Sequence, residues 1–257
     1  MTDQRWAEGR TAFITGATSG FGAALARRIV VAGGRVIATG RRADRLEALG
    51  RELGAAVLPR VLDIRDRSAI ATTVAGLPTD FAAIDLLINN AGLALGLGKA
   101  PDVRFEDWQT MIDTNVTGLA AVTQAILPGM IAHAKASDII NLSSVAASYP
   151  YAGGSVYGGT KAFVRQFSLN LRSDLLGKPI RVTSVEPGMC ETEFSLVRFD
   201  GNKDAADAVY QGMRPLSADD VALAIESVLR LPAHMNVNTI ELMPVQQAFA
   251  GFAVDRR

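Results

Sequence analysis

The sequence predicts an α/β protein folded as one domain around a doubly wound, parallel sheet of seven strands. Short apolar runs rich in β-forming residues alternate along the chain with longer helical patterns. Several runs are continuously apolar, as at Leu86–Ile88, which is typical of strands buried on both faces. With 257 residues, 49% of them hydrophobic, the chain can supply one core on both faces of a sheet. We therefore expect residues 1–257 to form a single domain.

Each strand and helix follows from its own stretch of sequence. The expected strands are Thr11–Thr15, Arg35–Thr39, Ala56–Leu62, Leu86–Asn89, Asp138–Leu142, Arg181–Glu186 and Thr239–Met243. The expected crossover helices are Phe21–Ala32, Ala43–Leu53, Glu106–Leu127, Tyr157–Leu175 and Ala218–Leu231. These helices are long enough to return the chain over the sheet with right-handed connections, so neighbouring strands run parallel.

One connection is longer than the others. Residues 187–217 contain Gly188, Gly201, Gly212 and Pro215 and show no clear strand. A connection of this length inside a compact domain is usually functional or mobile. Ligands of doubly wound sheets bind beyond the carboxyl ends of the strands, and this segment follows a strand. We expect it to cover the substrate as a lid; a plain surface excursion is the alternative.

Charge and composition exclude several classes of protein. The chain has 26 basic and 26 acidic residues with no basic block, so a nucleic-acid partner is not expected. No segment reaches 18 uninterrupted apolar residues and no secretory signal opens the chain, so we expect a cytoplasmic protein with no membrane partner. Cys190 is the single cysteine, and His133 and His234 lack metal-ligand neighbours, so no metal site is expected.

A glycine-rich turn between the first strand and the first helix predicts a dinucleotide site. The run Thr15–Gly22 places three glycines where a pyrophosphate approaches backbone N–H groups at a helix N-terminus. Its spacing, G-x-x-x-G-x-G, departs from the commoner G-x-G-x-x-G, and taken alone it also fits a tight turn. The candidate cofactor residues here are Gly16, Thr18, Ser19, Gly20, Phe21 and Gly22.

The end of the second strand favours NADP(H) over NAD(H). An NAD-specific enzyme usually places an acid there for the adenosine ribose, whereas this chain has Arg41 and Arg42. Guanidinium groups suit a 2′-phosphate, which arginine binds in a bidentate manner. A solvated basic pair is the alternative, but cations at the start of a helix oppose its dipole, which favours an anionic partner.

Tyr157 and Lys161 form a candidate proton-transfer pair. Four residues apart, they share one face of the expected helix. A free tyrosine titrates near pH ~10, and a cation at about 4 Å can lower that pKa by roughly 3 units. We therefore expect Lys161 to make the phenol of Tyr157 an acid and base near neutral pH. A chance pairing on a surface helix is the alternative for an isolated Y-x-x-x-K pattern.

Polar residues at the expected strand ends, and Asn115 inside an expected helix, join these motifs. They are Asp63, Asn89, Asn90, Asn115 and Ser144, the last preceding Tyr157 by 13 residues. Together with the glycine-rich turn and the Tyr157–Lys161 pair, they resemble the short-chain dehydrogenase/reductase family over essentially the whole chain. The resemblance implies a Rossmann-like fold and hydride transfer between a nicotinamide cofactor and a carbon that carries oxygen.

The resemblance also implies roles for individual residues. It adds to the cofactor site Asp63 at the adenine, Ile64, Asn90, Ala91, Gly92, Tyr157, Lys161, Pro187 and Gly188 beside the nicotinamide, and Thr192. Asp63 in a turn and Asn89 and Asn90 as strand terminators are the alternatives. The implied catalytic residues are Asn115, Ser144, Tyr157 and Lys161.

In the mechanism that this resemblance implies, Ser144 polarises the substrate oxygen and Tyr157 protonates it. Lys161 keeps the phenol acidic and holds the nicotinamide ribose, and Asn115 holds a water that links Lys161 to solvent. A serine hydrolase is the competing chemistry for Ser144, but the chain has no G-x-S-x-G motif.

Longer stretches resemble one subgroup, the bacterial NADP-dependent 3-hydroxy acid dehydrogenases that oxidise serine and allo-threonine. They are residues 90–96, 111–115, 149–153, 161–168 and 231–234. The run Pro187–Phe194 and the ending Phe249–Arg256 are closer to sulfoacetaldehyde reductases. Both groups imply a small anionic substrate.

A carboxylate or sulfonate needs a cationic or donor-rich anchor. Our candidates are Arg198 and, second, Arg214, with Tyr151 as a further donor and Ser144 at the reacting oxygen. Plain surface arginines and an aromatic pocket wall are the alternatives. A reductase of larger apolar ketones and an NADPH-binding regulator without turnover are the other functions that we consider. The relatives imply a homotetramer.

Overall fold

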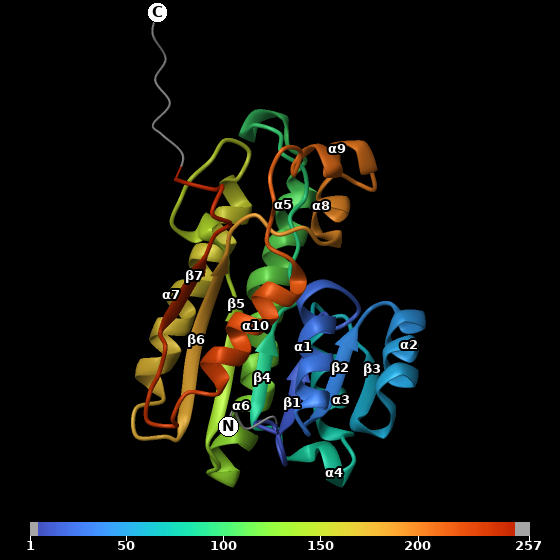
Figure 1. Ribbon diagram of the computed structural model, residues 1–257, viewed down its shortest axis with the longest axis vertical. Helices are drawn as coiled ribbons and strands as arrows, with labels where there is room; N and C mark the ends of the chain where they lie inside the picture. Colours follow the sequence, from blue (N-terminus) through green and yellow to red (C-terminus); the bar gives the residue numbers. More distant parts are fainter. Residues whose placement is uncertain (1–4, 250–257) are drawn as a thin grey trace, which may run out of the picture.

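The structure is a computed structural model that describes residues 5–249 (Figure 1). One parallel sheet runs through it in the order β3-β2-β1-β4-β5-β6-β7. Its strands are β1 (Thr11–Ile14), β2 (Arg35–Gly40), β3 (Val57–Val61), β4 (Leu86–Asn89), β5 (Ser137–Leu142), β6 (Ile180–Pro187) and β7 (Thr239–Leu242). The predicted seven-stranded, doubly wound sheet is therefore confirmed.

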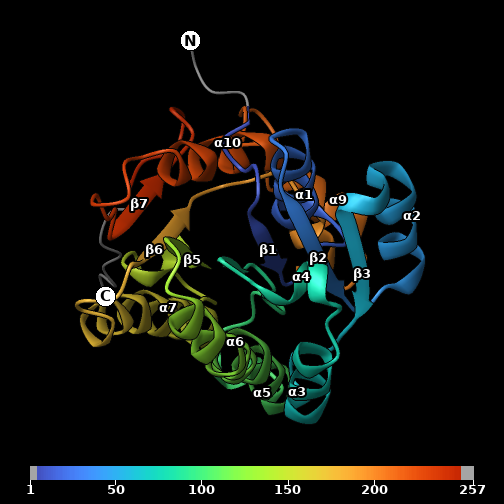
Figure 2. The ribbon, with the colours of Figure 1, turned by 90° about the horizontal axis from the view of Figure 1, so that it is seen from below.

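Helices cover both faces of the sheet (Figure 2). One face carries α1 (Gly20–Val31), α2 (Ala43–Leu53) and α10 (Ala218–Leu229). The other carries α3 (Arg67–Ala75), α4 (Thr79–Ala82), α5 (Phe105–Ile112), α6 (Leu119–His133) and α7 (Ser155–Asp174). Short turns of helix are η1 (Gly54–Ala56), η2 (Ala100–Asp102), η4 (Val145–Ala147), α8 (Glu193–Arg198) and α9 (Lys203–Ala208).

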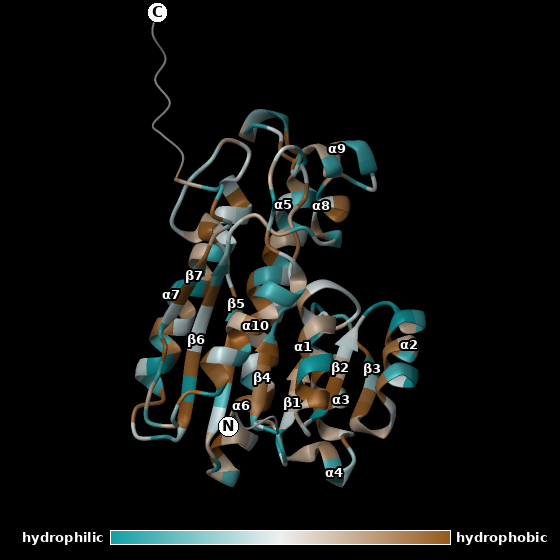
Figure 3. Cartoon of the chain, in the orientation of Figure 1, coloured by the Kyte–Doolittle hydropathy of each residue, from teal (hydrophilic) through white to brown (hydrophobic). Residues whose placement is uncertain are grey.

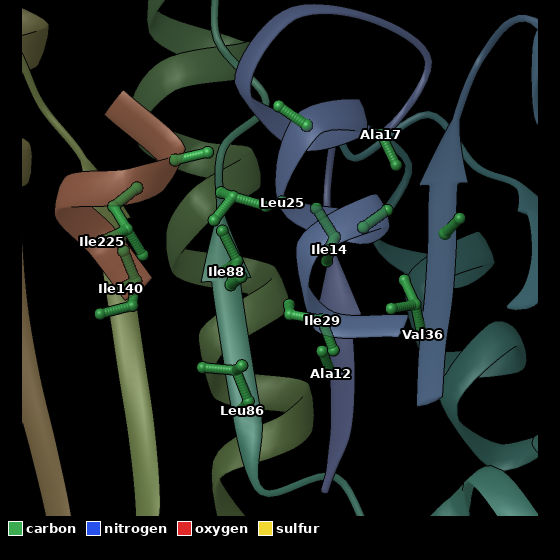
Figure 4. Packing of buried hydrophobic residues seen from close by; sticks show 14 of the residues in the cluster. Ala12, Ile14, Ala17, Leu25, Ile29, Val36, Leu86, Ile88, Ile140 and Ile225 are labelled. Atoms are coloured by element: carbon green, nitrogen blue, oxygen red, sulfur yellow. The ribbon is translucent and has the colours of Figure 1, made fainter. Parts of the chain in front are cut away.

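The apolar runs seen in the sequence become the middle of the sheet. Strands β1 and β4 are mostly hydrophobic, whereas α2 and α9 present hydrophilic residues outward (Figure 3). Figure 4 shows Ile29 of α1 and Ile225 of α10 packed over the strand residues Ile88 and Ile140, all of them buried. Burial of such side chains drives the folding of the sheet and fixes the strand ends that form the site.

The predicted helix Glu106–Leu127 differs from the observed one. It begins at Phe105 and continues through α5, a π-helical segment η3 (Asp113–Gly118) and α6, passing Pro128 to reach His133. Pro128 does not end the helix, because Met130 and Ile126 anchor this part in the core. The run 105–133 contains an 18-residue window of mean hydropathy 1.3, long and apolar enough by composition to cross a membrane. Its inner face packs on the sheet, which accounts for part of this apolar character.

Several short elements were not predicted. The pattern for α3 and α4 is weak, and both helices occupy one connection between β3 and β4. Segment 187–217 holds α8 and α9, followed by no strand before α10. Most of the ending that resembles sulfoacetaldehyde reductases, residues 250–256, lies outside the described residues.

Candidate active site

A cavity of about 820 Å³ opens at the carboxyl ends of the strands. Residues that follow β1 to β6 line it, together with segment 187–217 and residues 243–249. The end near β1, β2 and β3 contains the residues predicted to bind the adenosine half of the cofactor, and the end near β5, β6 and α7 contains the predicted catalytic residues. We call these the cofactor end and the catalytic end.

The glycine-rich turn is held by polar contacts from the neighbouring strand. The Nδ2 group of Asn90 donates to the carbonyl oxygens of Thr15 at 2.9 Å and Gly16 at 3.0 Å. A methyl group on Gly22 would stand 2.5 Å from the Gly16 oxygen, so the close approach of turn and helix requires glycine there. Ser19 directly precedes α1, and its side chain does not cap the first N–H groups of the helix. These N–H groups are therefore free to donate to an anion.

The two predicted cofactor arginines, Arg41 and Arg42, lie beside this turn and line the cavity. The guanidinium of Arg42 donates to Thr18 Oγ1 at 2.8 and 3.1 Å and to Ser19 Oγ at 2.8 Å. Among the residues that the structure describes, Arg41 makes no hydrogen bond or ion pair. The turn and the arginines therefore form one donor-rich corner that suits phosphate groups.

Glu193 completes this corner, although no sequence pattern predicted it there. Its carboxylate accepts from Arg42 Nη1 at 2.8 Å and from Arg45 Nη1 at 2.5 Å. Burial opposes ionisation of Glu193, but the hydrogen bonds and charges of Arg45 and Arg42 outweigh it and lower its pKa to about 2. The carboxylate is therefore ionised at any working pH.

Asp63 and Ile64 line the cofactor end, as predicted for the adenine site. Asp63 also accepts hydrogen bonds from Arg65, with Nε at 3.0 Å and Nη2 at 2.5 Å. The hydrogen bond from Arg65 is the main cause of the lowered pKa of Asp63. This aspartate is thus held as an anion at the edge of the cavity.

The four predicted catalytic residues come from three elements. Tyr157 and Lys161 project from one face of α7, Ser144 follows β5, and Asn115 lies in η3. The Ser144 hydroxyl donates to the carbonyl of Pro187 at 3.4 Å and accepts from the Ala146 N–H at 3.1 Å. The neighbouring Ser143 donates instead to the carbonyl of Lys161 at 2.8 Å, which makes it a structural residue.

Asn115 lies in the π-helical segment, buried behind Gly92 and outside the cavity lining. A π-turn inserts an extra residue into a helix and commonly marks a functional position. The Asn115 amide accepts from the Leu93 N–H at 2.9 Å and donates to the Leu93 carbonyl at 2.8 Å. A methyl group on Gly92 would stand 3.3 Å from both Asn115 Oδ1 and Lys161 Nζ, so the two polar groups border the same space.

The electrostatics of the Tyr157–Lys161 pair differ from our expectation. Burial raises the pKa of Tyr157 well above 10, while hydrogen bonding with Ser144 and the charge of Arg198 act in the opposite direction. Burial also lowers the pKa of Lys161 to about 8. The ammonium donates to the Leu142 carbonyl at 2.7 Å and lies 5.8 Å from the centre of the tyrosine ring. In this geometry the prediction that Lys161 lowers the pKa of Tyr157 was wrong, because desolvation dominates.

Arg198 and Tyr151 meet at the catalytic end. Arg198 Nη2 donates to the Tyr151 hydroxyl at 2.7 Å, and its Cζ lies 5.6 Å from the centre of the Tyr157 ring. Its backbone carbonyl accepts from the Gly96 N–H at 3.0 Å, which fixes the arginine over the site. Arg214, our second candidate, is exposed and is not part of the cavity lining. The structure thus brings only Arg198 to the reacting groups.

Charge is unevenly distributed in the cavity. Its lining contains the two carboxylates Asp63 and Glu193, both at the cofactor end and both paired with arginine. The lining of the catalytic end carries the cations Lys161 and Arg198 and, among the described residues, no carboxylate. No group of three histidine, cysteine or acidic side chains within residues 5–249 is arranged to hold a metal ion.

Residues far along the chain also shape the catalytic end. Gln247 accepts a hydrogen bond from the Met189 N–H at 2.7 Å, and Tyr210 donates to the Cys190 carbonyl at 2.6 Å. Phe194 packs on Tyr157 with 5.7 Å between ring centres. Gln247 and Tyr210 stand in no sequence motif and Phe194 carried no predicted role, and each of these contacts joins distant positions, so none of them was predicted.

Comparison with known proteins agrees with this geometry. The family model described as short chain dehydrogenase matches residues 10–202. A serine 3-dehydrogenase of Rhizobium radiobacter is 60% identical over 246 residues, covering 96% of this chain and 98% of the relative. The NADP-dependent 3-hydroxy acid dehydrogenase YdfG of Salmonella typhi is 55% identical, with 95% and 98% covered. A solved structure described as the closed form of serine dehydrogenase complexed with NADP⁺ superposes with a TM-score of 0.94 at 52% identity, covering 96% of this chain and all of that one.

Proposed function

We propose, from the premise that this chain belongs to the short chain dehydrogenase family, that it interconverts small 3-hydroxy acids and their semialdehydes with NADP(H). The single observation that carries the substrate class is the catalytic end of the cavity, where Lys161 and Arg198 face Tyr157 without a carboxylate in the described lining. A small anion is attracted there, and an apolar ketone gains nothing from Arg198.

The choice of NADP(H) rests on the arginine corner. At the end of β2 the chain has Gly40, Arg41 and Arg42, with no acid to accept from a ribose hydroxyl. Arg42, Thr18 and Ser19 are already joined by hydrogen bonds and border the cavity. These residues would hold the 2′-phosphate, while the glycine-rich turn would hold the pyrophosphate.

The other cofactor residues have matching positions. Asp63 and Ile64 would face the adenine, and Asn90, Ala91 and Gly92 would line the middle of the cleft. Pro187, Gly188 and Thr192 would border the nicotinamide, since they follow β6 at the catalytic end. Lys161 would hold the nicotinamide ribose beside Tyr157.

The nicotinamide, when bound, exchanges a hydride with the substrate carbon that carries oxygen. In the direction of reduction, the phenol of Tyr157 is protonated at working pH and donates its proton to that oxygen. Ser144 donates a hydrogen bond to the same oxygen as negative charge grows on it. In the direction of oxidation the phenol first passes its own proton toward solvent, by way of Lys161 and a water held at Asn115, and its oxygen then accepts the hydroxyl proton.

Arg198 and Tyr151 would orient the substrate by its acid group. The Nη1 nitrogen of Arg198 has no hydrogen-bond partner among residues 5–249, whereas Nη2 is occupied by Tyr151. Arg198 Cζ lies 5.6 Å from the Tyr157 ring centre, so the guanidinium would hold the acid group of a small substrate near Tyr157. A longer substrate would meet Phe194 and the segment above it.

We propose further that the chain acts as one domain in which residues 187–217 are a lid. In this proposal the protein is a cytoplasmic homotetramer. Phe105 is 64% exposed, and Phe163 is stacked on Phe167 along α7. Such surfaces on the helices of one layer support contact with further copies. Light scattering coupled to size exclusion tests the assembly, and a monomer would contradict it.

The experiment that tests the function is a substrate panel with NADP⁺ or NADPH. It contains L-serine, L-allo-threonine, 3-hydroxypropionate, malonic semialdehyde, sulfoacetaldehyde, isethionate and one bulky apolar ketone, each ranked by kcat/KM. We expect a carboxylate substrate at the top and a loss of about 10- to 100-fold when NAD⁺ replaces NADP⁺. Sulfoacetaldehyde at the top would assign a sulfonate substrate.

Three other results would each contradict a part of the proposal. Activity on the bulky ketone alone would remove the anion anchor. Tight NADPH binding with no turnover of any compound would favour a regulator. Equal kcat/KM with both cofactors would contradict the role of Arg41 and Arg42.

A further inference from the structure

Glu193 connects two regions that are distant in sequence. It is the first residue of α8 in the lid, and it bonds Arg42 and Arg45 at the start of α2, 151 and 148 positions away. Among the described residues, every hydrogen bond and ion pair between segment 187–217 and α2 involves this carboxylate. The part of the lid that lies at the cofactor end of the cavity is therefore joined to α2 through one side chain.

The other end of the same short helix is fastened at the catalytic end. Arg198 is the last residue of α8, and it bonds Gly96 and Tyr151. Beyond it, Asp200 and Gly201 have positive φ angles of 51° and 82°, where the chain turns sharply away. The helix therefore spans from the arginine corner to the substrate anchor as a rigid bar about 9 Å long.

The charges in the arginine corner balance only when a dianion joins Glu193. Arg41, Arg42 and Arg45 supply three positive charges, and Glu193 supplies one negative charge. A phosphate monoester carries about −1.5 to −2 charges near neutral pH. Glu193 and a 2′-phosphate therefore share the same arginines, and Arg42 is the guanidinium that both would contact.

We propose that Glu193 is a positioning residue for the lid. Its carboxylate holds the lid on the arginine corner, and its negative charge weakens binding of the 2′-phosphate to the same arginines. Glu193 thereby couples binding of the 2′-phosphate to closure of the lid. This inference rests on the proposed use of NADP(H). The charge of the carboxylate lowers the affinity for NADPH. Its hydrogen bonds hold α8, and with it Arg198, over the substrate. Its two contacts are partly exposed, with side chains 37 to 40% accessible, so the effects are moderate.

The test uses the full chain with Glu193→Gln. It measures the affinity for the cofactor and the KM for the substrate separately. The Kd for NADPH is expected to fall about threefold, with the Kd for NADH unchanged, because only the phosphate feels the lost charge. The KM for L-serine with NADP⁺ is expected to rise about fivefold with little change in kcat, because the lid is held less firmly. High salt reduces both changes.

Two further variants separate the effect of the lid contact from the effect of the Glu193 charge. Arg45→Gln breaks one of the two lid contacts but keeps the carboxylate and its bond to Arg42, so KM rises while NADPH binding does not tighten. Glu191→Gln removes a neighbouring exposed carboxylate that lies outside the cavity lining, and should alter neither readout. Equal shifts of Kd for NADPH and NADH in Glu193→Gln, or an unchanged KM, would overturn the inference. A native protein that binds both cofactors equally would instead contradict the proposed function.

Discussion

The cofactor end and the catalytic end of the cavity are assembled in different ways. At the cofactor end, turns that directly follow β1 and β4 hold one another, as when Asn90 bonds the backbone of Gly16. At the catalytic end, Arg198 is held by Gly96 and Tyr151, and Met189 by Gln247. The first set of contacts is fixed by the sheet, whereas the second depends on loops far apart in the chain. A cofactor site held by the sheet is therefore combined with a substrate site that is held by separate loops.

The largest effect is expected at Tyr157, where the two ends meet. Tyr157→Phe removes the transferable proton while keeping the ring that packs on Phe194. We expect kcat to fall by about 10³-fold, with the Kd for NADPH changed little. Rapid-mixing kinetics and fluorescence titration measure these separately. Tyr210→Phe removes another tyrosine hydroxyl of the cavity lining, one that bonds the Cys190 carbonyl, and it measures the effect of losing a hydroxyl that transfers no proton. Retention of kcat in Tyr157→Phe would mean that another group transfers the proton.

The close packing of the glycine-rich turn on α1 at the cofactor end is tested at Gly22. The added methyl group of Gly22→Ala would stand 2.5 Å from the Gly16 oxygen, which backbone cannot accommodate without shifting. We expect a cost of about 2 kcal/mol, or roughly 30-fold weaker NADPH binding, with little change in KM at saturating cofactor. Gly129→Ala in α6 meets no atom within 4 Å and should leave binding unchanged. Equal affinity in Gly22→Ala would show that the turn is not the cofactor cradle.

Burial of Lys161 predicts a pH dependence of stability. Its pKa is about 8 in the folded protein, against about 10.4 in an unfolded chain. Between these values the unfolded state binds more protons, so the free energy of unfolding rises with pH, by about 2 kcal/mol from pH ~7.5 to ~9.5. Urea unfolding of the native chain and of Lys161→Met checks this, since other titrating groups cancel between them. The same rise in Lys161→Met would assign the dependence to another group.

The smallest effect is expected where the lid joins α10. Ser217 caps this helix in a capping box with Asp220. Ser217→Ala should cost about 1 kcal/mol of stability and leave kcat/KM unchanged, because Ser217 is not part of the cavity lining. Thermal unfolding measures the loss, and Ser227→Ala, exposed within α10, serves as control. A large loss of activity would mean that the end of the lid controls catalysis.

The sequence predicted the sheet, and it marked the candidate residues of the cofactor end, because both kinds of signal are local. Apolar runs mark the strands, and Gly16, Asn90 and Asp63 each directly follow one. The π-helical segment around Asn115 was not predicted, because no residue pattern distinguishes it from a continuous α-helix. Glu193 was missed because only the folded chain brings it to Arg42. The pKa of Tyr157 was misjudged because burial cannot be read from the spacing of two residues.

The measurement that tests the central claim most directly compares 3-hydroxypropionate with its neutral amide in the native chain and in Arg198→Gln. The amide matches the acid in size and lacks only its charge. We expect the native chain to prefer the acid by about 10- to 100-fold in kcat/KM, and Arg198→Gln to lose most of that preference while turning over the amide normally. An unchanged preference for the acid in Arg198→Gln would contradict the claim that this arginine selects an acidic substrate.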